Sequence, residues 1–376
     1  MVPADGPLTA KIALVGEAPG DAEVAGGRPF IGPAGKLLDG MLEEAGIRRE
    51  ECYITNLLQE QPDASAASSK LRNDFGVLYE DSGRKSPSSR LLTNVERVRL
   101  ELQQVAPHVI VALGNEPLRW LTGKQGIGDW RGSVVDSEIN APYMPGAPSS
   151  DVNTLLSTGI KVLPTYHPAA ILRQWDWRPI AVFDLKKALS ESTTSTITRR
   201  PRHTTVGESI DQVMPILTQL AAPGAPIAFD IEVETQQVSS LALAASPEEA
   251  LVIPIFWGPT GSKWAPDDEE VLWETLADLF ATHPMIGQNV HYDLTFLRMY
   301  NVYATRIHMD TMVAFHVLYP ELPKGLEFMT SLYTDQPYYK WMRTTSDEQE
   351  FYRYNGLDAL VTYECAGAIE QELREA

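Results

Sequence analysis

Residues 226–234 have the sequence PIAFDIEVE, an apolar run typical of a β-strand in which two acids stand two positions apart. Successive side chains of a strand point to opposite faces of the sheet, so Asp230 and Glu232 share one face while Phe229 and Ile231 share the other. Neighbouring carboxylates repel each other unless a cation lies between them, and a divalent metal ion is a common solution. The same alternation also fits the polar outer face of an edge strand, so this stretch alone leaves both alternatives open.

The composition limits the class of protein. The chain has 376 residues, enough for two domains with ordinary cores, and its 44% hydrophobic and 22% charged residues are typical of a soluble globular protein. No apolar run approaches the roughly 20 residues of a membrane span, and the N-terminus lacks the basic and apolar segments of a secretory signal, so we expect no membrane partner and a cytoplasmic location. The only cysteines, Cys52 and Cys365, are too few for a disulfide framework or a thiolate metal site.

The net charge of −19 is concentrated in the second half of the chain. Residues 201–376 contain 26 acidic and 9 basic side chains. Such a field opposes tight binding of a polyanion. If this half acts on nucleic acid, we expect it to hold only a short piece, with the help of metal ions and local contacts.

The pattern along the chain predicts two domains. The first half alternates apolar runs with segments of helical spacing, which predicts an α/β fold with a mostly parallel sheet and helices on its faces. At residues 190–205, SESTTSTITRRPRHTT, this periodicity stops, which indicates a linker between domains at 1–189 and 206–376. Two polar stretches, 59–90 and 140–158, are expected to be exposed loops. The second half is expected to contain a helix near 208–221, strands at 226–234, 238–245 and 250–258, and a helical remainder.

Two later segments place further polar residues at helical spacing. In MIGQNVHYDLTFLRMYNV, residues 285–302, Asn289 and Asp293 stand four apart, and we expect them on one helix face with Leu297 following on the same side. In YNGLDALVTYE, residues 354–364, Tyr354 and Asp358 have the same spacing. Together with the strand at 226–234, these segments predict that four acids and a tyrosine converge.

The order of these motifs resembles the 3'-5' proofreading exonuclease domain of family A DNA polymerases, in the subclass with four acids and a tyrosine. The resemblance covers nearly all of residues 205–376, through FDIEVE, NVHYDLTFL and YNGLD. It implies an RNase H-like mixed sheet and phosphodiester hydrolysis with two Mg²⁺ or Mn²⁺ ions about 3.5–4 Å apart.

The same resemblance implies a role for each site residue. Asp230 is expected to bridge both ions, Glu232 and Asp358 to hold the ion on the nucleophile side, and Asp293 to support the second ion. Tyr354 is expected to orient the attacking water, and Asn289 to contact DNA. Asp310, in HMDTM, is interpreted as a helix cap rather than a catalytic residue.

The first half contains its own set of motifs. In LVGEAPGDAEVAGGRPFIGPAGKLL, residues 14–38, Gly16 and Gly20 allow a sharp turn after a strand and a close approach of the backbone to a ligand. The segment lacks GK[ST], which disfavours a nucleotide-triphosphate loop. This half resembles the uracil-DNA glycosylase superfamily, closest to its family 4. The matching segments are GEAPG, GRPFIGPAGKLL, YITNLL, VIVALG and HPAAILR.

This second resemblance implies a glycosylase-like three-layer sandwich and a uracil pocket. Phe30 is expected to stack on the uracil ring, Asn56 to hydrogen-bond its Watson–Crick edge, and His167 to face O2, where negative charge develops. Glu17 is expected to position water or to offset the oxocarbenium charge. Arg173 and the backbone near Pro168 are expected to hold flanking phosphates of DNA.

Two features depart from family 4. Its members carry an iron-sulfur cluster on four cysteines, which Cys52 and Cys365 cannot provide. The segment after Asn56, which is rich in Cys, Arg and Pro in the family, is the polar stretch 59–90 here. Whether the first half excises uracil or only binds it stays open.

The combination resembles the N-terminal part of large bacteriophage family A polymerases. The sequence ends shortly after the third exonuclease motif, so we expect either a free-standing nuclease beside a separate polymerase or part of a longer chain, in bacterial or phage-infected host cytosol. The leading hypothesis is a 3'-5' exonuclease on single-stranded DNA ends, joined to a uracil-recognising domain, in replication or repair. The alternative is a polymerase-binding proofreading subunit whose glycosylase-like domain is inactive and only docks DNA or protein.

Overall fold

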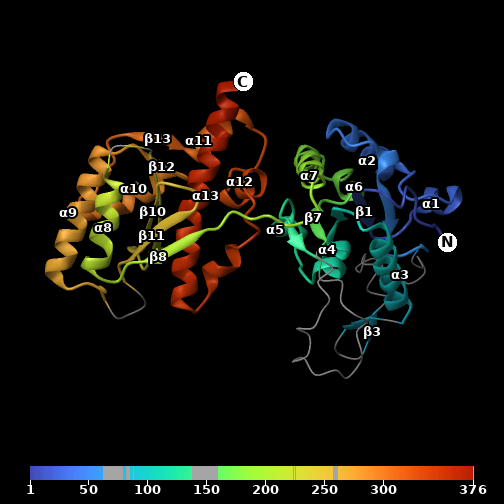
Figure 1. Ribbon diagram of the computed structural model, residues 1–376, viewed down its shortest axis with the longest axis horizontal. Coiled ribbons are helices and arrows are strands. Elements are labelled where there is room, and N and C mark those ends of the chain that lie inside the picture. Colours follow the sequence, from blue (N-terminus) through green and yellow to red (C-terminus); the bar gives the residue numbers. More distant parts are fainter. Residues whose placement is uncertain are drawn as a thin grey trace. The chain divides into compact units, whose positions relative to one another are not determined.

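The computed structural model contains two compact units, Met1–Thr198 and Arg199–Ala376, each built on its own sheet (Figure 1). It describes residues 1–61, 79–81, 85–87, 89–137, 160–222, 224, 226–256 and 261–375. Within these ranges, no helix combines the length and the apolar character needed to cross a membrane.

Unit 1 has a five-stranded sheet in the order β2-β1-β5-β7-β6, parallel except for β6. Its strands are β1 Ile12–Gly16, β2 Tyr53–Asn56, β5 Val109–Leu113, β6 Val135–Asp136 and β7 Lys161–Thr165; β3 Tyr79–Asp81 and β4 Lys85–Pro87 form a separate antiparallel pair. Its helices are α1 Asp21–Gly26, α2 Pro33–Glu44, α3 Ser89–Val105, α4 Asn115–Thr122, α5 Ile127–Trp130, α6 Pro168–Ile171, α7 Trp177–Glu191 and the short 3-10 turn η1 Arg49–Glu51.

Both faces of this sheet are covered. Side chains of β1 alternate between two hydrophobic clusters: Leu14 packs with residues of α2 and α7, and Val15 packs with residues of α3. A strand buried on both faces is expected to be apolar throughout, as β1 and β5 are. The predicted α/β fold with a mostly parallel sheet and three layers is confirmed for this unit.

Unit 2 has a six-stranded mixed sheet in the order β13-β12-β9-β10-β11-β8, in which β10 runs antiparallel to both of its neighbours. Its strands are β8 His203–Val206, β9 Ile227–Glu234, β10 Gln237–Ala244, β11 Glu249–Pro254, β12 Met285–Gly287 and β13 Ile307–Asp310. Its helices are α8 Ile210–Leu220, α9 Pro266–Thr282, α10 Val290–Leu297, α11 Thr311–Leu318, α12 Leu326–Tyr333 and α13 Glu348–Glu375, with 3-10 turns η6 Arg298–Tyr300 and η7 Lys340–Thr344.

The prediction of a helical remainder after β11 is wrong in one respect. Strands β12 and β13 extend the sheet beyond β9, so β9 is an internal strand rather than an edge strand. Both added strands have four residues or fewer, too short for a periodic pattern to mark them in the sequence.

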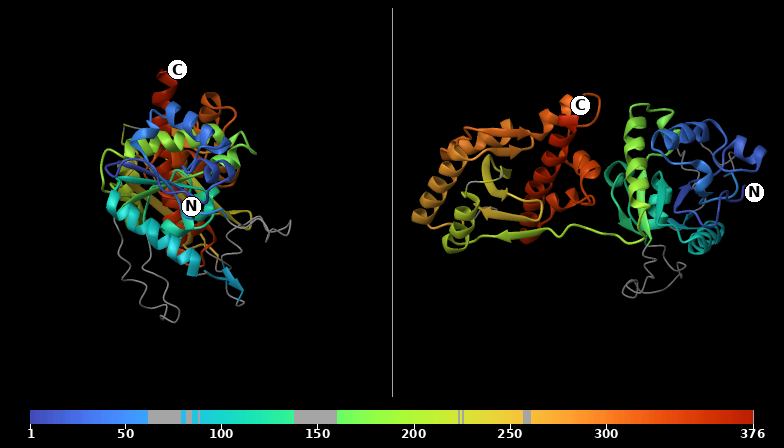
Figure 2. Two further views of the ribbon diagram at one scale, coloured as in Figure 1. Left: turned by 90° about the vertical axis from the view of Figure 1, so that its right-hand side faces the viewer. Right: turned by 45° about the horizontal axis from the view of Figure 1, so that its top comes forward.

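The two faces of β9 have different surroundings. Phe229 and Ile231 belong to the hydrophobic core that includes Val213 of α8 and Leu276 of α9. The opposite face is covered by α13, which packs across β9, β10 and β11. Figure 2 shows α8 and α9 on one side of this sheet and α13 on the other. The polar face of β9 is therefore turned towards α13 and away from bulk solvent.

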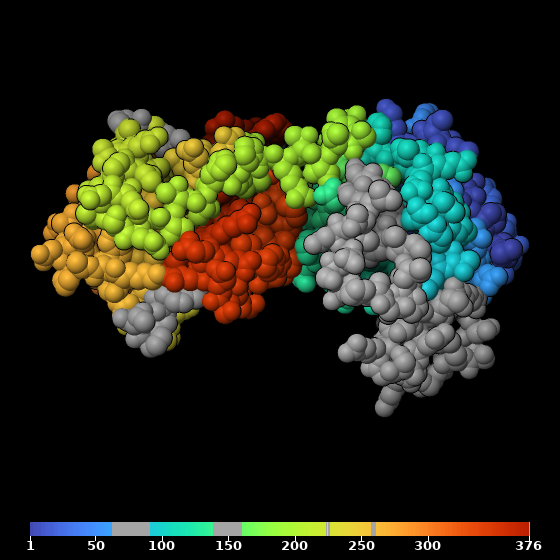
Figure 3. All heavy atoms as spheres, turned by 60° about the horizontal axis from the view of Figure 1, so that its bottom comes forward, coloured from blue at the N-terminus to red at the C-terminus, as the bar shows by residue number. Residues whose placement is uncertain are grey.

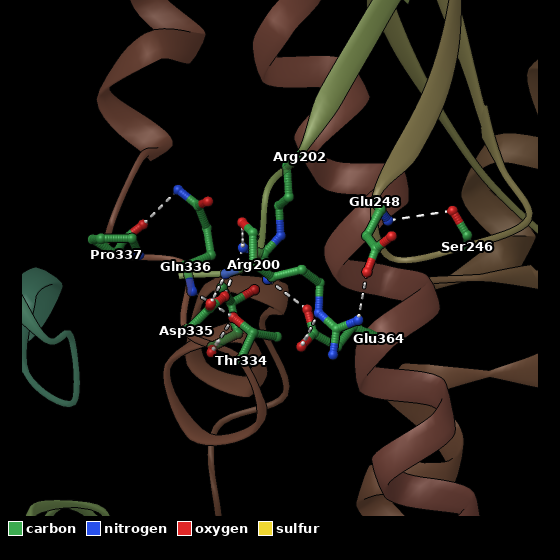
Figure 4. A network of polar contacts seen from close by, with 10 residues as sticks. Arg200, Arg202, Ser246, Glu248, Thr334, Asp335, Gln336, Pro337 and Glu364 are labelled. Carbon is green, nitrogen blue, oxygen red and sulfur yellow. Dashed lines mark hydrogen bonds and ion pairs between the residues drawn. The ribbon is translucent and has the colours of Figure 1, made fainter. Parts of the chain in front are cut away.

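The stretch 190–205 spans the division between the two units. It contains the end of α7, at Glu191, and the start of β8, at His203. Its second half is attached to unit 2, because Arg202 forms ion pairs with Asp335 at 2.6 Å and with Glu364 at 2.5 Å (Figure 4). In the space-filling view, yellow-green atoms from the beginning of unit 2 lie against red atoms of its C-terminal part (Figure 3).

Of the expected loops, 140–158 lies outside the described residues. The stretch 59–90 lies outside them except for 59–61, β3, β4 and the first residues of α3.

Candidate active sites

Three carboxylates come together between β9 and α13. Asp230, Glu232 and Asp358 each offer an oxygen atom, and these atoms lie within 4.8 Å of one another. Glu232 and Asp358 are buried, with 8% and 3% of their surface exposed. Three carboxylate oxygens so close together have the chemistry that Mg²⁺ and Mn²⁺ prefer, so this donor set fits a divalent ion.

The electrostatics of the cluster show how strongly the acids interact. Burial, and then the neighbouring Asp358, raise the pKa of Glu232 to about 7. Burial also raises the pKa of Asp230 well above its ordinary value, and the charges of Asp358, Glu232 and Asp293 add to the effect. Without a bound metal ion, Asp230 and Glu232 hold protons at pH values where exposed carboxyl groups are ionised.

Two cations from η7 face this cluster. Lys340 Nζ donates to both carboxylate oxygens of Asp358, at 2.8 and 2.7 Å, and lies 3.2 Å from Tyr354 Oη. The charge of Glu232 is the largest cause of the raised pKa of Arg343, so this guanidinium also lies within range of the acids. Tyr339 Oη donates to Asp358 as well. The segment at η7 therefore supplies positive charge to an otherwise acidic site.

Tyr354 projects to the same place as Asp358, as their spacing on α13 predicts. Its side chain is 2% exposed, and burial, followed by the charge of Asp358, raises the pKa of its phenol. The phenol thus stays protonated at neutral pH and acts as a hydrogen-bond donor.

Asp293, on α10, is not one of the three clustered carboxylates, but it lies close enough for its charge to act on Asp230. It is buried, and burial followed by the charge of Glu232 raises its pKa well above the ordinary value. Leu297 is buried on the same helix, as expected. Asn289, however, does not share the helix face: it precedes α10 with φ of 58°, in the left-handed region, and its side chain is exposed.

Asp310 explains why α10 begins after Asn289. Its Oδ1 accepts from Met312 N at 3.0 Å, which caps α11 and confirms the expected role. The same carboxylate accepts from Asn289 N and Val290 N, both at 3.1 Å. One acid therefore caps two helix starts and fixes the entry of α10.

The candidate uracil pocket lies at the ends of β1 and β2 in unit 1. Asn56 is paired in register with Gly16, and a Cβ atom at Gly16 would collide with Asn56 Oδ1 and with the ring of Phe30. Only glycine leaves room for both side chains. Asn56 Oδ1 is buried without a hydrogen-bond partner. A buried acceptor without a donor is costly, so this atom is a natural partner for the N–H group of a ligand.

A buried acid holds the loop that carries Phe30. Glu23 accepts from Ile31 N at 3.1 Å, from Gly32 N at 2.9 Å and from Gly20 N at 3.1 Å. Phe30 has φ of 53°, an unusual backbone conformation for a side chain of this size. The bonds to Glu23 stabilise this conformation on its C-terminal side.

His167 faces Phe30, with ring centroids 5.8 Å apart. Burial, and then the charge of Arg173, lower the pKa of His167 to about 4, so the ring is neutral at neutral pH. Its Nδ1 accepts from Ala169 N at 3.1 Å, which places the remaining proton on Nε2. The ring can therefore donate one hydrogen bond without carrying a positive charge.

The other predicted residues of unit 1 lie beside this pocket. Glu17 follows β1 directly and is partly buried. Arg173 is exposed in the segment after α6, close enough for its charge to act on His167. Cys52 and Cys365 are buried in different units, so the donor set does not fit a four-cysteine cluster.

An ion-paired arginine secures the strand end that carries Asn56. Arg97 Nη2 donates to the carbonyls of Asn56 and Leu57, at 2.6 and 3.1 Å, and Nη1 pairs with Glu101 at 2.6 Å. Thr55 Oγ1 donates to the same Glu101 at 2.9 Å.

Several of these residues were not identified from the sequence, among them Glu23, Arg97 and Lys340. A further one is Asn355, a buried amide that donates to Asp230. Glu23 could have been noticed in the sequence, because an acid three positions after the residue that precedes a helix is typical of a capping box. The sequence gives a weaker indication for Lys340, which is one of few cations in a strongly acidic half of the chain. Arg97 and Asn355 act through contacts between segments far apart in the sequence, which no local pattern reveals.

The sequence of unit 1 is similar to that of known proteins. The model of the uracil DNA glycosylase superfamily matches residues 3–189. A type-4 uracil-DNA glycosylase of Thermotoga maritima is 31% identical over 200 residues, covering 50% of this chain and 82% of its own. The corresponding enzyme of Saccharolobus solfataricus is 29% identical over 203 residues, covering 52% and 78%.

A solved structure described as the apo form of a nuclease also aligns with this chain. The identity is 18%, the alignment covers 48% of this chain and 84% of the other, and the TM-score is 0.36.

Proposed function

The chain belongs, through residues 3–189, to the uracil DNA glycosylase superfamily, and from this premise we propose a DNA-processing enzyme with two sites. Unit 2 is a metal-dependent 3'-5' exonuclease that removes nucleotides from single-stranded DNA ends. Unit 1 recognises uracil in DNA. We place the protein in bacteriophage-type DNA replication or repair, beside a separate DNA polymerase.

The observation that carries the exonuclease proposal is the carboxylate cluster of Asp230, Glu232 and Asp358. These acids would hold Mg²⁺ or Mn²⁺, with Asp293 as a further acid, and the ions would supply positive charge at the scissile phosphate and activate water. The protonated phenol of Tyr354 is suited to orient that water. Unit 2 has few basic residues, so we expect it to release DNA often.

The exonuclease proposal is tested by replacing Asp230. We expect wild-type protein with Mg²⁺ to release mononucleotides from a single strand labelled at its 3' end, and the Asp230→Ala variant to release none while keeping its circular dichroism spectrum. Asp267→Ala, an exposed acid at the start of α9, is the matched control and should keep full activity. Continued digestion by a folded Asp230→Ala variant would refute the assignment.

The observation that carries the uracil proposal is the unpartnered Oδ1 of Asn56 beside Phe30. Uracil presents an N–H donor between two carbonyl acceptors, so Asn56 Oδ1 would accept from N3–H while neutral His167 donates from Nε2 to O2. A neutral donor that faces O2 would stabilise the negative charge that develops there as the glycosidic bond breaks. Phe30 would stack on the flipped base.

Excision of uracil is tested in the nuclease-silent Asp230→Ala background. A 5'-labelled single strand with one uracil is incubated with the protein and then treated with hot alkali, which breaks abasic sites. A break at uracil that disappears on His167→Ala would establish glycosylase activity. No break, while wild-type protein still digests ends, would favour the alternative of a proofreading subunit whose unit 1 only docks DNA or protein.

A further inference from the structure

A buried amide connects α13 to the carboxylate of Asp230. Asn355 has no exposed surface and lies between Tyr354 and Asp358 on α13. Its Nδ2 donates to Asp230 Oδ2 at 2.7 Å and approaches the Asp230 backbone oxygen at 3.3 Å. The donor is thus fixed both to the side chain and to the main chain of one residue of β9.

The orientation of this amide is determined at its other end. Asn355 Oδ1 accepts from Ser240 Oγ at 2.8 Å, and Ser240 is fully buried on β10. The backbone oxygen of Asp230 can only accept hydrogen bonds, whereas the hydroxyl of Ser240 can donate. The amide therefore turns its NH₂ group to Asp230 and its oxygen to Ser240. A rotation by 180° would place two oxygens against each other.

Asn355 and Ser240 are connected to both acids of β9 that belong to the cluster. Ser240 is paired in register with Glu232, while Asn355 holds Asp230, two residues before Glu232. One oxygen of Asp230 is engaged by the amide, which restricts the rotation of the carboxylate and leaves its other oxygen available to the cluster. Partners that orient metal ligands in this way typically change metal affinity or activity by about 10- to 100-fold when removed.

We propose that Asn355, held by Ser240, is a positioning residue that orients the Asp230 carboxylate for metal binding. The inference rests on the proposed function of unit 2. It explains why a fully buried amide lies one position after Tyr354 in the YNGLD motif, where an apolar residue would pack without need of partners.

The test measures Mn²⁺ binding directly, by electron paramagnetic resonance of free Mn²⁺ during titration of the full chain. We expect Asn355→Ala to weaken Mn²⁺ binding by about 10- to 100-fold, and Ser240→Ala to weaken it by roughly tenfold or less. Ser239→Ala is the matched control, because Ser239 is equally buried on β10 but donates to the backbone oxygen of Glu232, at 3.1 Å. It should leave Mn²⁺ affinity unchanged.

A kinetic measurement separates positioning from a general structural effect. For Asn355→Ala, the Mg²⁺ concentration that gives half-maximal digestion should rise, and the rate should recover towards the wild-type value at saturating Mg²⁺. Folded Asn355→Ala and Ser240→Ala variants that bind Mn²⁺ as tightly as wild type would overturn the proposal. If Asn355→Ala fails to fold, the Mn²⁺ affinities of Ser240→Ala and Ser239→Ala are compared instead. The proposal then requires weaker binding by Ser240→Ala than by Ser239→Ala.

Failure of the proposed function has a different signature. If wild-type protein binds Mn²⁺ no better than Asp230→Ala does, the metal site itself is absent and both proposals fall. If Asp230→Ala abolishes binding while Asn355→Ala and Ser240→Ala do not weaken it, only the role of Asn355 is refuted.

Discussion

Lys340 is expected to stabilise the acidic cluster in the absence of metal and to compete with metal for Asp358. Its ammonium group contacts both oxygens of Asp358, and the two side chains are only 19% and 5% exposed. Removing one partner of a buried ion pair costs about 3–5 kcal/mol. We take about 3 kcal/mol for Lys340→Met, since protonation of the neighbouring acids relieves part of the loss.

The pH changes this cost in a defined direction. Glu232 has an ordinary pKa of 4.5 and a pKa of about 7 in the folded, metal-free unit. Between these values the folded protein binds more protons than the unfolded chain, so its stability falls as the pH rises through this window. Lys340→Met removes a positive charge that favours the ionised acids, so its destabilisation should be larger at pH 8 than at pH 5.5.

The assay is thermal unfolding of the full chain with and without Mn²⁺. About 3 kcal/mol corresponds to roughly 6–12 °C for a unit of this size. We expect the metal-free melting temperature of unit 2 to fall by that amount at pH 8, and the increase on adding Mn²⁺ to be larger than in wild type, because the ion no longer displaces an ammonium group.

The matched control is Lys263→Met, which removes a partly exposed ion pair with Glu348 elsewhere on α13. It should change stability by less than about 1 kcal/mol and leave the Mn²⁺ response unchanged. If Lys340→Met and Lys263→Met gave equal metal-free shifts and equal Mn²⁺ responses, the competition between Lys340 and metal would be refuted.

Three further predictions concern the pocket and the helix caps. Burial lowers the pKa of His167 from an ordinary 6.5 to about 4, so the unfolded chain binds more protons than the folded one between these pH values. Unit 1 should therefore lose stability as the pH falls through this window. An NMR titration midpoint near 6.5 for this ring would contradict the prediction. Gly16→Ala should abolish uracil binding, measured by calorimetry, because the added methyl group collides with Asn56 and Phe30; unchanged affinity would show that uracil binds elsewhere. Asp310→Ala should destabilise unit 2 by about 1–2 kcal/mol and reduce nuclease activity, since α10 loses its fixed start; a denaturant midpoint and rate equal to wild type would contradict it.

Much of the acidic site follows from local periodicity. Strand alternation in residues 226–234 places Asp230 and Glu232 on one face, and the four-residue spacing of Tyr354 and Asp358 places both on one side of α13. These residues lie together in the structure. Periodicity could succeed here because strand and helix geometry alone determine which side chains share a face.

The same reasoning failed where tertiary contacts decide the local structure. Asn289 has the right spacing to share a helix face with Asp293, but its backbone N–H donates to the carboxylate of Asp310, 21 residues further along. Asn289 therefore lies before the helix, in a left-handed conformation. Lys340 reaches Asp358 from a short 3-10 turn whose position depends on the whole unit. Neither contact follows from the periodicity of the nearby sequence.

In unit 1, the motif segments indicated the fold and the pocket, but not the means by which the pocket is held. The unusual backbone conformation of Phe30 depends on how its loop packs. The hydrogen bond from Arg97 to the carbonyl of Asn56, at the end of β2, depends on a contact between distant segments. The sequence shows directly that the chain lacks the four cysteines of family 4. The roles of Arg97 and Glu101 at the end of β2 became apparent only in the structure.

We propose that Asp230, Glu232 and Asp358 bind the metal ions that cleave the 3' end of DNA. The most direct test is a crystal of the full chain soaked with Mn²⁺ and a short single strand, measured at a wavelength that reveals manganese. This assignment predicts manganese peaks among these three carboxylates, beside the last phosphodiester of the strand, with Lys340 moved away from Asp358. Manganese bound elsewhere, or a DNA end distant from this cluster while Lys340 still pairs with Asp358, would contradict it.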